Sequence, residues 1–209
     1  MTTEELIRHL SAQATPVRYR AAWIVLGPGL IIGALAAVGL VALFMGVAAP
    51  ESGGWLAATI AFGLTFSGAG LVALLPLLRP GADTRQPKRY IFAAAALLGV
   101  LLVIQLADTP SGFWSVARIF EAVVRCPLSI VAFALPVFGT LLIALRSEAP
   151  THLNLTGAAL GLTSGGIAAA AYALGCRDCL PPDSVVCATL GIALATGAGS
   201  IAGPCLLRW

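Results

Sequence analysis

The sequence predicts an all-α integral membrane protein with six membrane-spanning helices, and two observations carry this prediction. Of the 209 residues, 59% are hydrophobic and only 10% are charged, with a mean hydropathy of +0.96. Soluble domains carry about 25% charged residues, so too few charges are present to cover a soluble globule. The charges also divide the chain into six long uncharged stretches, each near the length of about 20 residues that crosses a bilayer.

The same composition excludes several classes of protein. A soluble enzyme and a soluble binding domain would need a more polar surface than this chain can supply. Intrinsic disorder requires low hydrophobicity, which is the opposite of what is observed. The net charge of +3 comes with no dense basic cluster, so we expect no binding of nucleic acid.

The expected helices follow from the six uncharged stretches. The first is not a cleavable signal peptide, because a polar segment of about twenty residues precedes it and no convincing cleavage site ends it. Residues 1–22 are therefore expected to form a separate N-terminal segment, and residues 23–209 a single transmembrane domain. The expected spans are about 23–49, 54–78, 90–107, 126–145, 153–175 and 184–207.

The basic residues predict that both termini lie in the cytoplasm. With that orientation, nine Lys and Arg residues fall in cytoplasmic segments and three fall in outer loops. An excess of Lys and Arg in short loops marks the cytoplasmic side of a membrane protein. The outer three are Arg118, Arg125 and Arg177.

The spans themselves show no catalytic or transport chemistry. None has an Asp, Glu, Lys or Arg in its interior, which argues against a pump, an ion-coupled transporter or an intramembrane protease. Glycines do recur at four-residue spacing, which lets helix backbones approach closely. We expect these glycines to pack the bundle, with a homodimer face as the alternative. They are Gly157, Gly161 and Gly165, Gly29 and Gly33, and Gly199 and Gly203.

The N-terminal segment is one of two chemically distinctive regions. Thr2 and Glu5 form a capping-box pattern that predicts the start of a short helix. Leu6, Ile7 and Leu10 then make a small apolar stripe at helical spacing. A helix this short is marginal alone, so its apolar face needs either a lipid or bundle surface or the groove of a soluble partner.

The cysteines are the other distinctive region. Cys126, Cys176, Cys179 and Cys187 map to the outer side, whereas Cys205 lies near the inner end of the last span and is expected to pack inertly. Thiols pair in an oxidising compartment, and four thiolates could instead gather a soft metal ion such as zinc or cadmium. A structural disulfide, a sensing role and catalytic thiol exchange all stay open.

The main alternative function is a membrane thiol-disulfide oxidoreductase that passes electrons from outer cysteines to a quinone. Such an enzyme would need a quinone pocket with a polar or basic anchor, and no charged residue lies at membrane depth. A small-solute transporter is disfavoured by the same uncharged spans. We therefore expect a protein that is not an enzyme and holds no cofactor.

Several short motifs, taken together, resemble the NrsF-like proteins, which are multi-pass membrane anti-sigma factors. The likeness covers the whole chain in length, number of spans and order of motifs. The motifs are Thr3-Glu4-Glu5-Leu6-Ile7 with Leu10, Pro16-Val17-Arg18, Arg125-Cys126-Pro127-Leu128 with Leu135-Pro136, Gly157–Gly166 followed by Tyr172-Ala173-Leu174 and Cys176, and Leu206-Leu207-Arg208-Trp209.

The resemblance implies a function and a set of site residues. It implies a bacterial cytoplasmic (inner) membrane protein that holds an extracytoplasmic-function sigma factor away from RNA polymerase through its N-terminal segment. The residues expected to bind that partner are Glu5, Leu6, Ile7 and Leu10.

The resemblance also implies that Cys126 and Cys176 respond to heavy metals or oxidants. Cys179 and Cys187 depart from the family pattern, so the responding group is either the pair or a larger cluster.

Overall fold

The structure, a computed structural model, describes residues 22–46, 53–78, 85–108, 121–146, 152–176 and 181–206. Six long helices occupy these ranges, and all six are long and apolar enough to cross a membrane, as predicted. A single π-helical turn, η2 (Glu121–Arg125), directly precedes the fourth of them. The helices are α2 (Ala22–Phe44), α3 (Gly53–Leu77), α4 (Arg85–Asp108), α6 (Cys126–Arg146), α7 (Leu153–Gly175) and α8 (Pro181–Leu206).

The largest differences from the expected spans are at two helix ends, and each has an identifiable reason. Helix α2 ends at Phe44, short of residue 49, because Gly46 adopts a left-handed conformation with φ of 77° that ends helices. Helix α4 begins at Arg85 rather than at residue 90. Its first turn carries charged side chains, which are exposed, so the helix can include them without a desolvation penalty. The short helix expected in the N-terminal segment lies outside the described residues.

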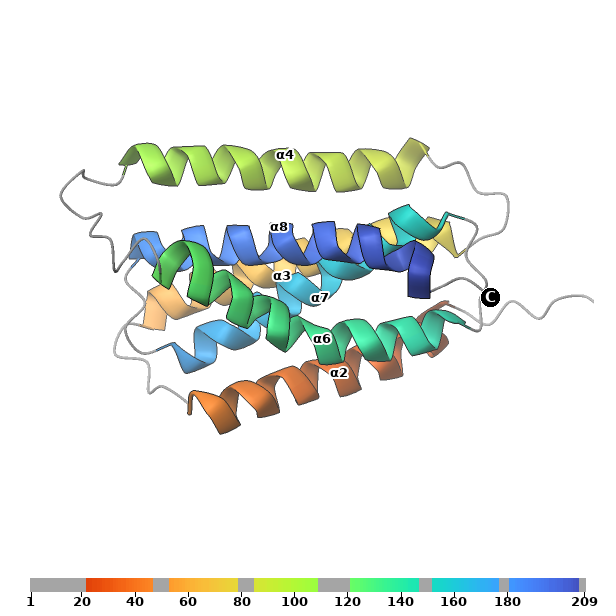
Figure 1. The fold of residues 1–209 in the computed structure, drawn as a ribbon, viewed down its shortest axis with the longest axis horizontal. Helices are drawn as coiled ribbons and strands as arrows, with labels where there is room; N and C mark the ends of the chain where they lie inside the picture. Colours follow the sequence, from red (N-terminus) through yellow and green to blue (C-terminus); the bar gives the residue numbers. More distant parts are fainter. Residues whose placement is uncertain are drawn as a thin grey trace, which may run out of the picture.

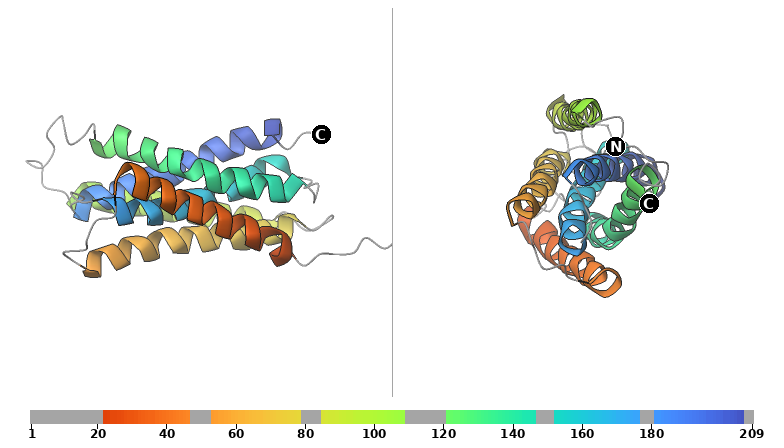
Figure 2. Two further views of the ribbon diagram at one scale, coloured as in Figure 1. Left: turned by 90° about the horizontal axis from the view of Figure 1, so that it is seen from below. Right: turned by 90° about the vertical axis from the view of Figure 1, so that its left-hand side faces the viewer.

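The helices pack side by side along one long axis, with α7 at the centre (Figures 1 and 2). Helix α7 contacts each of the other five long helices. In its most apolar stretch, 83% of residues are buried, compared with 17% in α4. Helix α4 lies at the edge of the bundle, against α3 and α8 (Figure 1).

The central position of α7 depends on glycines that let backbones touch. A Cβ atom on Gly157 or Gly161 would collide with the backbone carbonyl of Gly199 or Ala195 on α8. On the opposite side, a Cβ on Gly166 would lie 2.6 Å from the backbone nitrogen of Ser67 on α3. Real Cβ atoms do not approach other atoms so closely, so only glycine fits at these positions.

A separate glycine contact joins α2 to α6. A Cβ on Gly33 would lie 2.8 Å from the Val137 Cα, and a Cβ on Gly29 would lie 3.2 Å from the Thr140 carbonyl oxygen. The glycine faces named in the sequence therefore pack within the chain in the part that the structure describes. Intramolecular packing accounts for them without a homodimer.

Three buried hydroxyls of α7 are satisfied by their own helix. The hydroxyls of Thr156, Thr163 and Ser164 on α7 donate to backbone carbonyls three or four residues earlier, at 2.9–3.2 Å. Such bonds remove the cost of placing a hydroxyl away from water. Large apolar side chains fill the core and also cover the outer surface, where the most exposed include Ile31, Leu35, Leu43, Phe92, Leu135 and Ile201.

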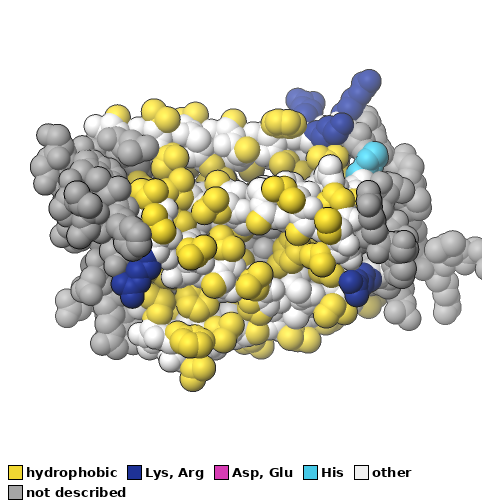
Figure 3. Space-filling model, in the orientation of Figure 1, with side chains coloured by type: hydrophobic (Ala, Val, Ile, Leu, Met, Phe, Trp, Pro, Cys, Tyr) yellow, Lys and Arg dark blue, Asp and Glu magenta, His cyan; other side chains and the backbone are white. Residues whose placement is uncertain are grey.

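The outer surface is divided as a bilayer requires. Figure 3 shows hydrophobic side chains over the middle of the bundle and Lys and Arg side chains at its two ends. The described Lys and Arg residues are Arg85, Lys88, Arg89, Arg125 and Arg146, and all are exposed.

The glycine packing gives a matched pair of substitutions on α8. We expect Gly199→Leu to destabilise the purified protein by about 1–3 kcal/mol, because overpacking displaces the backbone of α7. Gly199→Ala should have a smaller effect in the same direction. Gly197→Leu is the control, since a Cβ at Gly197 meets nothing within 4 Å. Thermal unfolding in detergent measures all three variants, and equal melting temperatures for Gly199→Leu and Gly197→Leu would contradict the packing described above.

Candidate functional site: the disulfide end of the bundle

The structure describes part of the candidate site. Cys126, Cys176 and Cys187 are described, and they lie at the same end of the bundle, where α6 and α8 begin and α7 ends. Glu5, Leu6, Ile7 and Leu10 lie outside the described residues, as does Cys179. The geometry therefore concerns the cysteines and the helices that hold them.

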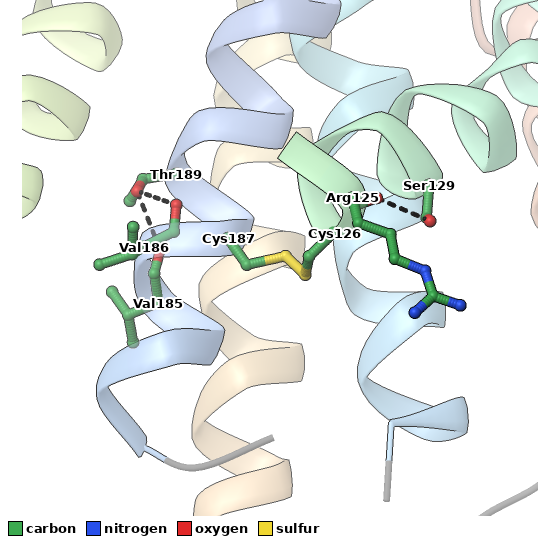
Figure 4. The surroundings of a disulfide bond; sticks show 7 residues. All are labelled: Arg125, Cys126, Ser129, Val185, Val186, Cys187 and Thr189. Atoms are coloured by element: carbon green, nitrogen blue, oxygen red, sulfur yellow. Dashed lines mark hydrogen bonds between the residues drawn. A yellow bond between two sulfur atoms is a disulfide. The ribbon is translucent and has the colours of Figure 1, made fainter. Parts of the chain in front are cut away.

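Cys126 occupies the junction between η2 and α6. The π-helical turn ends at Arg125 and the α-helix begins at Cys126, followed by the buried Pro127. Pro127 cannot donate a backbone hydrogen bond, which suits a position where the π-helical turn gives way to the α-helix. The Ser129 hydroxyl donates to the Arg125 carbonyl at 2.9 Å, which secures the same turn (Figure 4).

Cys126 forms a disulfide with Cys187 on α8 (Figure 4). The two Cα atoms are 5.7 Å apart, an ordinary separation for a disulfide. Both cysteines are buried, with exposed fractions of 8% for Cys126 and 2% for Cys187. The bond thus joins the start of α6 to the first turns of α8, inside the bundle.

The pairing of Cys126, which the sequence left open, is thus with Cys187 in the part of the chain that the structure describes. A signal for this pairing is present in the sequence: Cys126 opens its span, and Cys187 lies in the first turns of a span that starts at the same end of the bundle. Pairing also depends on the rotation of each helix about its axis, which spacing alone does not give.

Cys176 lies at the end of α7 and is half-buried. Its backbone N–H donates to the Tyr172 carbonyl at 3.2 Å, which closes the last turn of the helix. Cys176 is also disulfide-bonded, to a partner outside the described residues. This end of α7 contacts α6 through two aromatic rings: the ring centroids of Tyr172 and Phe133 are 6.4 Å apart.

A metal centre is a separate question from the disulfides. Among the residues that the structure describes, no three His, Cys, Asp or Glu side chains come together as a set of metal ligands. The described cysteines at this end are in the oxidised, bonded form, in which sulfur is not available as a thiolate ligand.

Two further contacts hold α6 in place. One turn inward from the disulfide, a Cβ on Gly191 of α8 would lie 2.9 Å from the Ile130 side chain, so α6 and α8 are closely packed there. At the other end of α6, the Arg146 guanidinium donates to the Leu206 carbonyl of α8 at 3.3 Å. Helix α6 is thus tied to α8 at both ends, a feature that sequence reasoning missed.

Cys205 differs from its expected role. It is a free cysteine and is exposed, so the expectation that it packs inside the bundle is wrong. On α8 it lies two residues beyond Gly203, which meets α7, and the helical rotation over two residues turns its side chain away from that contact.

Comparison with known proteins gives the family. A family model described as "Negative regulator of sigma F" matches residues 10–209. A curated relative from Azospira oryzae, named "Probable anti-sigma-F factor NrsF", is 30% identical over the full length of both chains. Another from Caulobacter vibrioides, named "Anti-sigma-F factor NrsF", is 32% identical over 68% of this chain and 66% of its own length.

No solved structure matches the chain. The family match nevertheless begins at residue 10 and runs through all six helices and through Cys126, Cys176 and Cys187. The chain belongs to the NrsF family of negative regulators of sigma F.

Proposed function

We propose that this chain is a membrane-bound anti-sigma factor that sequesters an extracytoplasmic-function sigma factor through its cytoplasmic N-terminal segment. In this proposal it resides in the bacterial cytoplasmic membrane, with both termini inside, and releases the sigma factor when outer cysteines respond to heavy metal or oxidative stress. Membership in the NrsF family over residues 10–209 is the observation that carries the proposal. The family description as a negative regulator also favours this role over a thiol oxidoreductase.

Two parts of the chain have distinct roles in the proposal. The apolar stripe of Leu6, Ile7 and Leu10, with Glu5 beside it, docks on the sigma factor. Cys126 and Cys176, with Cys179 and Cys187 as further members, form the sensing group. The buried bond between Cys126 and Cys187 supports a sensing role, because breaking it would release the start of α6 from α8.

A route between the two parts follows from the contacts of α6. Its outer end is bonded to α8 through the disulfide, and its surface around Val137 and Thr140 packs on Gly33 of α2. Helix α2 continues directly from the N-terminal segment. Energetic coupling between distant sites is typically about 1–3 kcal/mol, or roughly 5- to 150-fold in affinity. A coupling of this size between α6 and α2 is enough for the proposed release of the sigma factor.

The docking surface is tested by introducing a negative charge into the apolar stripe. In the full-length protein, we expect Leu6→Asp or Leu10→Asp to weaken capture of the sigma factor by about 30-fold or more, the usual effect of losing an interface hot spot. The target promoter should become active without stress. His9→Asp is the matched control on another face of the expected helix. Co-purification from membranes measures binding, and unchanged capture by both leucine variants would remove this segment from the interface.

The sensing group is tested by serine substitutions read out as the stress response of the target promoter. We expect Cys126→Ser and Cys187→Ser each to bring the ratio of stressed to unstressed transcription close to 1, because neither variant can make or break the bond. Cys205→Ser should keep the full response, since this thiol is unbonded in the structure. A full response in Cys126→Ser would exclude a sensing role for the bond.

Orientation is tested by labelling intact cells with a membrane-impermeant maleimide. In a variant lacking Cys126, Cys187 and Cys205, we expect labelling of the remaining thiols after mild reduction. In a variant without native cysteines, a thiol introduced by Ser147→Cys, directly after the end of α6 at Arg146, should react only once the membrane is permeabilised. The reverse pattern would place the termini outside and overturn the proposed relay.

A further inference from the structure

An apolar cavity lies between α4 and its neighbours α8 and α7. Its volume is about 210 Å³. One side is formed by a stripe of α4 from Ile91 to Leu102, and the other by α8 from Thr189 to Thr196 with Leu162 of α7. Small residues leave part of this space open: a Cβ on Gly99 of α4 would meet nothing within 4 Å, and Ala95 and Ala193 also line the cavity.

The chemistry of the lining requires a hydrocarbon occupant. The two polar residues in it, Thr189 and Thr196, donate their hydroxyls to carbonyls of α8 itself at 2.7–2.9 Å. With these hydroxyls bonded, the two threonines offer the cavity no unbonded donor hydrogen. Every other lining residue is apolar. Such an apolar lining offers no partners for the hydrogen bonds of water but does accept apolar molecules.

The length of the cavity matches one leaflet of a bilayer. The stripe from Ile91 to Leu102 rises about 16 Å along α4, at about 1.5 Å per residue. Half of a hydrocarbon core of about 30 Å is about 15 Å. The stripe lies midway along α4, and its length fits one acyl chain that extends inward from the start of the helix.

Positive charge lies at the end of this stripe. Lys88 is one helical turn before Ile91 on the same face of α4, and Arg89 follows it; both are exposed. The first turn of α4 contains no acidic residue, although the positive end of a helix dipole favours negative charge. Two cations beside the N–H groups of a helix start form a site for an anion, and Figure 3 shows this cluster projecting from the edge of the bundle.

We propose that α4 and α8 bind an anionic phospholipid, with one acyl chain in the cavity and the phosphate against Lys88, Arg89 and the first turn of α4. The acyl chain fills the space between the helices, and the phosphate neutralises the cations at the helix start. Its test is independent of the proposed function, because it measures lipid binding and neither sigma-factor capture nor the stress response.

The experiment compares phosphatidylglycerol with phosphatidylethanolamine of identical acyl chains, added to the full-length protein in detergent. Native mass spectrometry measures bound lipid, and thermal unfolding measures stabilisation. The wild-type protein should retain phosphatidylglycerol preferentially. Each basic residue near a membrane surface contributes about fivefold in affinity for anionic lipid, so Lys88→Gln with Arg89→Gln should weaken phosphatidylglycerol binding by about 25-fold. Gly99→Leu should abolish retention of the lipid by filling the cavity.

Two control variants distinguish a specific lipid site from nonspecific binding of lipid to positive charge or apolar surface. Arg146→Gln removes an exposed cation on another helix, and Gly139→Leu adds the same side chain to α6 where a Cβ also meets nothing within 4 Å. Both should bind phosphatidylglycerol as the wild type does. Equal binding of the two lipids by the wild type, equal loss in Arg146→Gln, or full binding by Gly99→Leu would each overturn the proposal.

Discussion

The whole bundle depends on the contact of the α7 backbone with its neighbours. Within lipid, hydrophobic surfaces gain little by meeting one another, so close backbone packing has to hold helices together. Gly157 and Gly161 meet α8, and Gly166 meets α3, with no room for a side chain at any of the three. Because α7 touches every other long helix, its fixed position determines where the remaining helices can lie.

The other helices are held less uniformly. Helices α3, α7 and α8 form a centre with backbone-to-backbone contacts, whereas α6 is joined to α8 by the disulfide at Cys126, by Ile130 against Gly191 and by Arg146. Helix α2 packs on α6 through Gly29 and Gly33. The pair α2 and α6 thus packs on one side of this centre, and the cavity beside α4 lies on the opposite side.

Much of the fold could be predicted from the sequence, and the cysteine pairing could not. Long uncharged stretches are a direct consequence of the bilayer, so the six helices follow from hydropathy. The four-residue glycine spacing predicts close helix packing but does not say which helix is the partner of Gly157. The bond between Cys126 and Cys187 and the contact from Arg146 to the Leu206 carbonyl depend on how each helix is rotated in three dimensions. The π-helical turn before Cys126 has no signature in the sequence that identifies it beforehand.

The position of the disulfide along the chain has a consequence for synthesis. Cys126 cannot bond to Cys187 until the last helix has left the ribosome and entered the membrane. At about 5–20 residues per second, the N-terminal segment exists for many seconds before that moment. Each new molecule therefore passes through a nascent stage in which the first segment is complete while the covalent link between α6 and α8 has still to form.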